Sequence, residues 1–424
     1  MNVFVPALAF RAFPGAATDR LLQEPPVLSI ALPSLAPQRA IRRTLGSLLA
    51  AALLVAAPVQ AQSSMAAPDI AARSWFLIDV TTNTVLYSQA PDERVEPASL
   101  TKLMTAYLAF SALRDGTLQK DARPPVSQRA YKSIGSRMFV DPRAPATVDE
   151  LLHGLIIQSG NDAAIILAEA IAGSEEAFAQ RMNDEARRIG MKNTHFVNAS
   201  GLPAADHYST ARDLGLLSMR IIKDFPDYYR IYSEKEYTFN NVKQNNRNRL
   251  LFLDPSVDGM KTGHTDAAGY CLIASSARNQ KDGNFSRRIL SVLLGASNDV
   301  ARATESQKLL NYGFQNFEAL TLFEKNKPVS GSPVWKGMKP EVKAGFTDDV
   351  LVTAPRARMK DIKGEIERAE SLMAPIHAGQ RIGTLRIKLG DTVLAERPLV
   401  ALESVEPAGW FKQTWDTIKL WWIK

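Results

Sequence analysis

The spacing of apolar residues predicts a mixed α/β region from Ser74 to about Phe323. Residues 74–88 predict two strands around a Thr-Thr-Asn-Thr turn, and apolar runs of strand length occur over 269–277 and 287–296. Apolar positions recur at helical spacing over 101–113, 147–156, 161–172, 175–190, 211–223 and 305–317. Because strands come from both ends of this region and helices from its middle, we expect the ends to pair in one sheet with helices packed on it.

A different pattern begins at about Lys325. The stretch 326–334 is rich in Pro, Gly and Ser and is interpreted as a linker. Segments of alternating character follow over 350–354, 381–389 and 392–402, separated by Gly, Asp and Pro. They predict a small all-β domain of sandwich type, so the expected fold class is α/β (α+β) followed by an all-β domain.

The N-terminus has the features of a secretory signal peptide. Three arginines within 39–43 precede an apolar run over 45–57, which is too short for a bilayer that needs about 20 residues. Small residues in Val59-Gln60-Ala61 then mark a cleavage site, so 1–61 is predicted to be a signal peptide. Residues 1–38 precede any normal basic region, which leaves a misassigned start and an unusually long leader as alternatives. Removal of 1–61 takes away five arginines and two acidic residues, and lowers the net charge from +7 to +4.

The C-terminal segment 406–424 is predicted to form an amphipathic helix. Four of the six tryptophans of the chain lie in its last part, 410–424. One helical face would carry Trp410, Phe411, Trp415, Ile418, Trp421 and Trp422, and the other Lys412, Gln413, Asp416 and Lys419. Such a helix suits a membrane interface, where it would anchor the protein through Trp410–Lys424. The alternative is a helix packed on the protein surface.

Composition argues against several functional classes. The single cysteine, Cys271, can form neither an intramolecular disulfide nor a cysteine-based zinc site. The five histidines lack metal-ligand spacing, so neither a metal nor another cofactor is expected. The basic residues form no stripe interleaved with aromatic residues, and there is no P-loop or dinucleotide-binding glycine pattern. We therefore expect no nucleic-acid partner.

The first chemical motif is Ser99-Leu100-Thr101-Lys102, at the point where an irregular segment containing Pro97 gives way to a helix. One helical turn separates Ser99 from Lys102, so the amine is expected beside the hydroxyl. A neutral lysine in a dry site can take the proton of a serine and make it a nucleophile. Taken alone, this motif would more often be a helix cap followed by an incidental lysine.

Two further motifs follow along the chain. Ser159-Gly160-Asn161 lies between two predicted helices, and its hydroxyl and amide can project together into one cleft. Lys261-Thr262-Gly263 lies just before a predicted strand; its ammonium and hydroxyl groups suit a substrate carboxylate. Gly263 would leave room for a substrate backbone along the strand edge. Taken alone, the first motif could be a helix cap and the second an ordinary turn.

Together, these motifs resemble those of penicillin-binding proteins and serine β-lactamases. The strings PASLTKLMTA, SGNDAA, FVNASGLP, VDGMKTGHTDAAGYCLIASS and LLGASND are similar to low-molecular-mass penicillin-binding proteins, the serine D-alanyl-D-alanine carboxypeptidases. The resemblance covers nearly the whole mature chain. It implies a catalytic domain of the penicillin-binding type over 62–324, a β-sandwich domain over 325–405 and a membrane-lying helix over 406–424.

The resemblance also implies a role for each motif residue. Ser99 would form an acyl-enzyme with the penultimate D-Ala of a peptidoglycan pentapeptide stem and expel the terminal D-Ala. Lys102 would be the general base for acylation, Ser159 would bridge proton transfer, and Asn161 would hold the acyl chain. The backbone N–H groups of Ser99 and His264 would form the oxyanion hole.

Recognition of the substrate carboxylate falls, by the same resemblance, to Lys261, Thr262 and the more distant Arg302, with Arg247 as a further candidate. The chain has no glutamate-containing loop like that of the β-lactamase relatives, so β-lactams should acylate the protein covalently and leave slowly. The expected location is peripheral, on the periplasmic (extracytoplasmic) face of the cytoplasmic membrane. Two alternatives stay open, a DD-endopeptidase that cuts cross-links and an inactive wall-binding scaffold.

Overall fold

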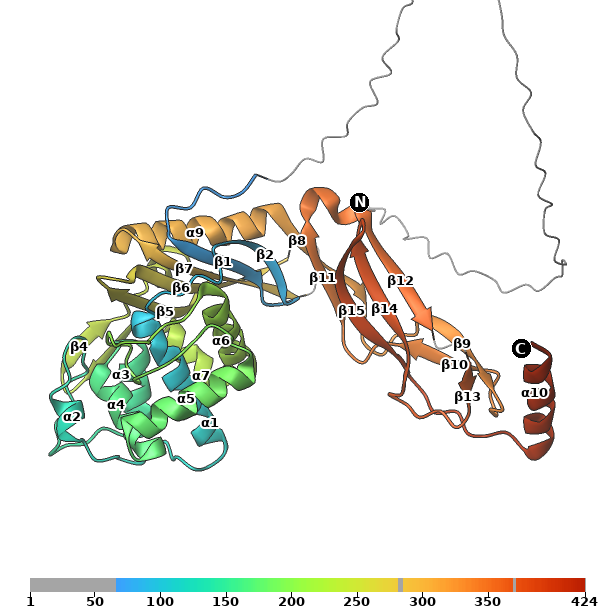
Figure 1. Ribbon diagram of the computed structural model, residues 1–424, viewed down its shortest axis with the longest axis horizontal. Helices are drawn as coiled ribbons and strands as arrows, with labels where there is room; N and C mark the ends of the chain where they lie inside the picture. The colour runs from blue at the N-terminus through green and yellow to red at the C-terminus, as the bar shows by residue number, and fades with distance from the viewer. Residues whose placement is uncertain (1–65, 281–284, 369–370, 424) are drawn as a thin grey trace, which may run out of the picture. The chain divides into compact units, whose positions relative to one another are not determined.

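The computed structural model of the chain describes residues 66–280, 285–368 and 371–423 (Figure 1). The predicted signal peptide, 1–61, lies outside the described residues. No helix within the described ranges is long and apolar enough to cross a lipid bilayer.

A five-stranded sheet forms the centre of the first folded region. Its strands are β1 (Ser74–Asp79), β2 (Thr84–Gln89), β5 (Val257–Thr265), β6 (Gly269–Asn279) and β7 (Ser286–Ala296), in the order β2-β1-β7-β6-β5. β1 pairs antiparallel with β7, with Ser74 opposite Leu294 and Asp79 opposite Ile289. A strand from the start of the region therefore pairs with one from its end, which confirms the fold predicted from the sequence.

Helices cover both faces of this sheet. The helical elements are η1 (Ala98–Thr101), α1 (Lys102–Arg114), α2 (Gln128–Tyr131), α3 (Val148–Ile156), α4 (Asn161–Ala172), α5 (Glu175–Ile189), α6 (Ala211–Asp224), α7 (Pro226–Tyr229), η2 (Arg230–Ser233), α8 (Leu250–Leu253) and α9 (Asp299–Asn316). A hairpin of β3 (Glu236–Phe239) and β4 (Val242–Asn245) lies beside them. Figure 1 shows α9 on one face of the sheet and the main group of helices on the other.

Two glycines allow this close packing of helices on the sheet. A Cβ at Gly313 of α9 would come within 2.9 Å of Ile289, and a Cβ at Gly215 of α6 would come within 2.9 Å of Phe76. Val292, opposite Phe76 in the sheet, also lies against Gly215. Since alternate strand residues face opposite sides, Ile289 and Val292 contact α9 and α6 on the two faces.

The start of α9 differs from the prediction. The predicted helix covers 305–317, but α9 begins at Asp299, because the Asn298 side chain accepts the Ala301 N–H at 2.8 Å and caps the first turn. The helix ends before Phe317, which is the first residue of the next strand. The side-chain cap, and not the spacing of apolar residues, therefore sets the start of this helix.

The C-terminal region is all-β, as predicted. Its elements are β8 (Phe317–Phe323), β9 (Ser330–Trp335), β10 (Glu341–Gly345), β11 (Val350–Pro355), η3 (Arg356–Asp361), β12 (Ile362–Arg368), β13 (Leu372–Met373), β14 (Arg381–Leu389) and β15 (Thr392–Ala401), followed by α10 (Trp410–Ile423). One sheet has the order β12-β14-β15-β10-β9-β13, and β8 and β11 form a second. Their apolar residues form a hydrophobic cluster separate from that of the first region.

Two segments near the domain boundary were assigned wrongly from composition. The predicted linker 326–334 contains most of β9, because Ser332 and Val334 are buried and β9 pairs with β10. The segment 317–323 was included in the catalytic domain, but as β8 it pairs with β11 of the C-terminal region. At β9, strand pairing overrides a local composition that favours loops.

A buried ion pair lies at the junction of the two regions. Arg287 Nε donates to Asp79 Oδ2 at 2.6 Å, and the two side chains are 1% and 0% exposed. The other contacts reach the C-terminal region: Thr353 Oγ1 donates to Asp79 at 2.8 Å and Arg287 donates to the Phe317 carbonyl at 2.8 Å. Charges buried this completely depend on one another, since the loss of one leaves the other without a counter-charge.

Removal of one partner should therefore be costly. We expect Asp79→Ala to lower the free energy of unfolding by about 3–5 kcal/mol, because the Arg287 guanidinium would stay buried and unpaired. Urea unfolding of the purified protein measures this effect. The matched control is Glu365→Ala, which breaks an exposed pair with Lys388 and should cost less than about 1 kcal/mol. Equal losses in the two variants would contradict the prediction.

Candidate active site

The turn that carries Ser99 is held under backbone strain. Ser99 lies in η1 directly after Ala98, whose φ of +48° is in the left-handed region. A non-glycine residue keeps such a conformation only where its surroundings impose it. Gly201 lies so close that a Cβ there would stand 1.8 Å from the Ala98 carbonyl oxygen. The loop containing Gly201 therefore supports the turn by direct backbone contact.

Lys102 is the first residue of α1, and its hydrogen-bond partners determine the direction of its lone pair. Its Nζ lies 3.0 Å from Ser99 Oγ, 2.7 Å from Asn161 Oδ1 and 2.6 Å from the Ser200 carbonyl oxygen. The Asn161 amide has one orientation, because its Nδ2 donates to the Ile134 carbonyl at 2.6 Å. Asn161 Oδ1 and the Ser200 oxygen can only accept hydrogen bonds. They occupy both N–H bonds of a neutral amine, and the lone pair is left facing the Ser99 hydroxyl.

The surroundings of Lys102 favour this neutral form. Burial lowers the pKa of its amine to about 7, and the positive charge of Arg247 acts in the same direction. Asp162 and Glu175 act in the opposite direction. Neither carboxylate is free, because Asp162 accepts backbone N–H groups and Glu175 pairs with Arg129 at 2.9 Å. Lys102 can therefore be deprotonated near neutral pH.

The start of α4 and the loop opposite hold each other in place. The Asp162 carboxylate accepts the backbone N–H groups of Met138 at 3.0 Å and Phe139 at 2.8 Å. The Asn161 N–H donates to the Ser136 carbonyl at 2.7 Å. Phe139 is a second non-glycine residue with a positive φ, +66°. These bonds fix the helix end that presents Asn161 to Lys102.

Ser159 and Lys261 form a second buried pair of hydroxyl and amine. Ser159, with a φ of +61°, lies between α3 and α4 as predicted. Lys261 on β5 donates to Ser159 Oγ at 2.8 Å and to the Thr262 carbonyl at 3.2 Å. Burial, together with repulsion from Lys102 and two arginines, holds the pKa of Lys261 well below its usual range.

These groups face a cleft of about 310 Å³. It is lined by Ser99, Ser136, Ser159, Arg247, Thr262, Gly263, His264, Tyr270 and Arg302. Lys102, Asn161 and Lys261 lie just behind the lining and contact it through the bonds described above. The fold thus brings all ten residues named from the sequence to one place. Within the described part of the chain, no carboxylate lines this cleft, and its charged lining residues, Arg247 and Arg302, are both cations.

Sequence reasoning missed two residues that line the cleft. Tyr270 pairs with His264 across β5 and β6, with ring centroids 4.1 Å apart, and the Arg302 guanidinium lies 5.5 Å from the centre of its ring. A strand register counted from the 261–263 motif could have found it. Ser136 comes from a distant loop with no local signal. Asp162 was also missed, although it directly follows Asn161.

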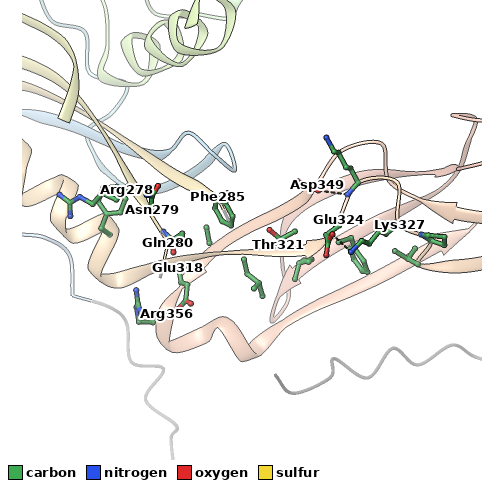
Figure 2. Close-up of a pocket in the computed structure, with 18 residues that line it drawn as sticks. Arg278, Asn279, Gln280, Phe285, Glu318, Thr321, Glu324, Lys327, Asp349 and Arg356 are labelled. Carbon is green, nitrogen blue, oxygen red and sulfur yellow. Dashed lines mark hydrogen bonds and ion pairs between the residues drawn. The ribbon is translucent and has the colours of Figure 1, made fainter. Parts of the chain in front are cut away.

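A larger hollow of about 1100 Å³ lies elsewhere and contains none of these residues (Figure 2). Its lining charges include internal pairs, such as Lys327 with Glu324 and Arg356 with Glu318. Across the described ranges, no group of His, Cys, Asp and Glu side chains could hold a metal ion.

Comparison with known proteins identifies the family of the chain. A family model described as D-alanyl-D-alanine carboxypeptidase matches residues 61–298, more than half of the chain. The chain belongs to this family. A second model, described as penicillin-binding protein 5, C-terminal domain, matches 317–407.

Individual relatives agree with the family models. The D-alanyl-D-alanine carboxypeptidase DacC of Escherichia coli is 40% identical over 85% of this chain and 90% of its own length. The crystal structure of penicillin-binding protein 5 from Haemophilus influenzae has a TM-score of 0.74, with 37% identity over 81% of this chain and 99% of its own. A penicillin-binding protein of Listeria monocytogenes, solved with ampicillin bound, has a TM-score of 0.53, with 30% identity over 59% of this chain and 100% of its own.

Membership of the carboxypeptidase family confirms the predicted fold and enzyme class. The protein is a serine-type D-alanyl-D-alanine carboxypeptidase of the penicillin-binding group. Its C-terminal region is likewise of the kind found in penicillin-binding protein 5.

The lowered pKa of Lys102 gives a prediction about pH. Only the neutral amine can take the Ser99 proton, so the rate of acylation by a penicillin should rise as the pH rises through about 7 and then level off. Below that midpoint the rate should fall about tenfold per pH unit. Stopped-flow labelling with a fluorescent penicillin measures the profile. A rate that stays constant from two pH units below the midpoint to one above it would contradict a lysine base.

Proposed function

We propose that Ser99 is the nucleophile and Lys102 the general base of a D-Ala-D-Ala carboxypeptidase acting on peptidoglycan pentapeptide stems. The contacts of Lys102 support this assignment most directly, since two fixed acceptors leave its lone pair facing Ser99. A base within hydrogen-bond reach of the hydroxyl is the first requirement for activating a serine.

Acylation follows from these positions. Ser99 Oγ attacks the carbonyl carbon of the penultimate D-Ala while Lys102 Nζ takes its proton. The backbone N–H groups of Ser99 and His264 stabilise the negative oxygen of the tetrahedral intermediate. The C–N bond then breaks, and the terminal D-Ala leaves after its nitrogen receives a proton through Ser159. Water later hydrolyses the ester and frees Ser99, while Asn161 holds the acyl chain.

The cationic side of the cleft suits a substrate that ends in a carboxylate. Thr262 and Arg302 line the cleft, and Lys261 lies beside them. Arg302 is 7% exposed and pairs with Asp299, which fixes its direction. Arg247, in the lining, adds positive charge. A Cβ at Gly263 would come within 3.2 Å of Ala98 and of the Pro97 carbonyl oxygen, so this glycine lets β5 pack closely on the turn that carries Ser99.

Slow release of β-lactams follows from the absence of a carboxylate in the lining. A carboxylate base would be needed to activate water rapidly against the acyl-enzyme, as in the β-lactamase relatives. The acidic groups whose charge acts on Lys102, Asp162 and Glu175, are held by backbone N–H groups or by Arg129. The ampicillin-bound Listeria relative is consistent with a long-lived complex in this family.

Intact mass spectrometry with benzylpenicillin tests these roles. The wild-type protein should gain the mass of one penicillin and keep it for minutes or longer. Ser99→Ala should gain no mass. Lys102→Ala should be acylated at least about a hundredfold more slowly than the wild type, which is the usual effect of losing a general base. His377→Gln, exposed in the C-terminal region, is the control and should behave as wild type. A stable adduct on Ser99→Ala would overturn the assignment.

Product analysis distinguishes carboxypeptidase from endopeptidase. Incubation with pentapeptide muropeptides should release free D-Ala, whereas cross-linked dimers should remain largely uncut. Cleavage of dimers without release of D-Ala would favour the endopeptidase alternative.

We also propose that α10 holds the mature protein on the outer face of the cytoplasmic membrane. Two polar residues of α10 contact the β domain: Lys412 donates to the Gly337 carbonyl at 2.6 Å, and Asp416 accepts the Lys336 N–H at 2.8 Å. The aromatic residues face away; Trp421 and Trp422 are 80% and 81% exposed. A helix that simply packed on the protein would bury these rings. Their exposure favours a lipid interface.

Sedimentation with anionic lipid vesicles tests this anchor. We expect the mature chain to sediment and a chain ending at Glu403 to remain in solution, because it lacks the exposed aromatic face. Trp415→Gln/Trp421→Gln/Trp422→Gln should act like the truncation. The control Phe252→Gln/Leu253→Gln removes exposed apolar side chains elsewhere and should sediment as wild type. Continued sedimentation of the truncated chain would count against the anchor.

A further inference from the structure

The loop Val197–Gly201 carries one of the two acceptors that direct Lys102. Its Ser200 carbonyl accepts from Lys102 Nζ at 2.6 Å, and its Ala199 carbonyl accepts from Thr105 Oγ1 at 2.6 Å. The Asn198 side chain closes the loop on itself by accepting the Gly201 N–H at 2.7 Å. This loop therefore lies behind the catalytic cleft, and its position sets the direction of the lysine lone pair.

His207 joins this loop to the segment that carries the nucleophile. The Val197 N–H donates to His207 Nδ1 at 3.2 Å, so Nδ1 carries no proton and Nε2 does. His207 Nε2 lies 2.9 Å from Thr101 Oγ1 and donates to it. Thr101, between Ser99 and Lys102, is fully buried, and His207 is 4% exposed. One imidazole thus bridges the loop and the Ser-x-x-Lys turn.

The surroundings of His207 keep this bridge neutral and fixed. Burial lowers the pKa of the ring to about 4, and the nearby His195 acts in the same direction. The Phe196 ring packs edge-on against it, with centroids 5.9 Å apart. The backbone of Tyr208 exchanges two hydrogen bonds with that of His195, which anchors the segment next to His207. The ring therefore keeps one tautomer across the pH range in which Lys102 titrates.

We propose that His207 is a positioning residue for acylation: by tying Val197 to Thr101, it keeps the Ser200 carbonyl on Lys102 and the lysine lone pair on Ser99. The proposal rests on the roles of Ser99 and Lys102 given above. His207 touches neither the substrate nor the reacting atoms, and it acts through the loop and the turn. Displacement of a catalytic group by about 1 Å can reduce a rate by up to about a hundredfold.

The proposal predicts different effects on the binding of the substrate or penicillin and on the acylation step. The proposed carboxylate-binding groups Lys261, Thr262 and Arg302 lie on β5 and α9, which are separate elements from the loop that His207 holds. Loss of the histidine bridge should therefore lower the acylation rate constant and leave the dissociation constant of the pre-acylation complex unchanged. A general loss of stability would instead change the melting temperature without this separation.

Four variants of the full mature chain test the role, with a fluorescent penicillin as the probe. His207→Leu removes both hydrogen bonds and should lower the acylation rate constant about tenfold, and Thr101→Val removes the acceptor and should do the same. The double variant should be no slower than the slower single variant, because both changes break one bridge. His207→Gln keeps a donor near Thr101 and should stay within about threefold of wild type. His377→Gln is the control.

The outcomes separate this inference from the assignment of function. A wild-type protein that is not acylated would overturn the proposed function itself. If the wild type is acylated and both single variants match it in rate constant at a temperature where all are folded, His207 has no positioning role. If the dissociation constant rises and the acylation rate constant is unchanged, the bridge serves binding and the proposal is wrong. If His207→Leu does not fold, Thr101→Val decides by the same criteria.

Discussion

A buried amine whose hydrogen-bond partners are all neutral is the constraint on which the site depends. Lys102 contacts a hydroxyl, an amide oxygen and a backbone carbonyl, and no carboxylate is among these partners. Burial of an ammonium without a paired anion is unfavourable, so the environment favours the neutral amine. The two carboxylates near enough to restore the charge, Asp162 and Glu175, are occupied by backbone N–H groups. The neutral form of Lys102 thus depends on these acidic side chains being engaged by other groups.

This arrangement needs rigid support from separate parts of the chain. The acceptors on Lys102 come from positions 59 and 98 residues away along the sequence. Around them lie three non-glycine residues with positive φ, Ala98, Phe139 and Ser159. Strain of this kind persists only where packing imposes it, and it concentrates at functional sites. The sheet and the helices on its two faces supply that packing.

The catalytic cleft and α10 depart from the usual pattern of side-chain burial in opposite ways. In the cleft, charged groups that would normally be solvated are buried, which alters their chemistry. On α10, aromatic rings that would normally be buried are exposed, while Lys412 and Asp416 contact the β domain. Each departure from ordinary burial underlies one of the partners proposed above, a carboxylate-ended peptide for the cleft and a lipid surface for α10.

Local pattern was enough to predict elements whose apolar face meets the core, such as α4 and α5, because the period of the sequence reflects the buried face. It also supplied the chemistry of Ser99 and Lys102, which one helical turn places side by side. It failed at the start of α9 and at β9, and it did not find Ser136, Tyr270 or His207, since each depends on a cap, a strand partner or a distant loop. The sequence by itself determined which nucleophile, amines and amides are present and in what order. Only the tertiary structure decided that Lys102 is dry, which of its atoms are occupied and where its lone pair points, because those properties belong to contacts between segments far apart in the chain.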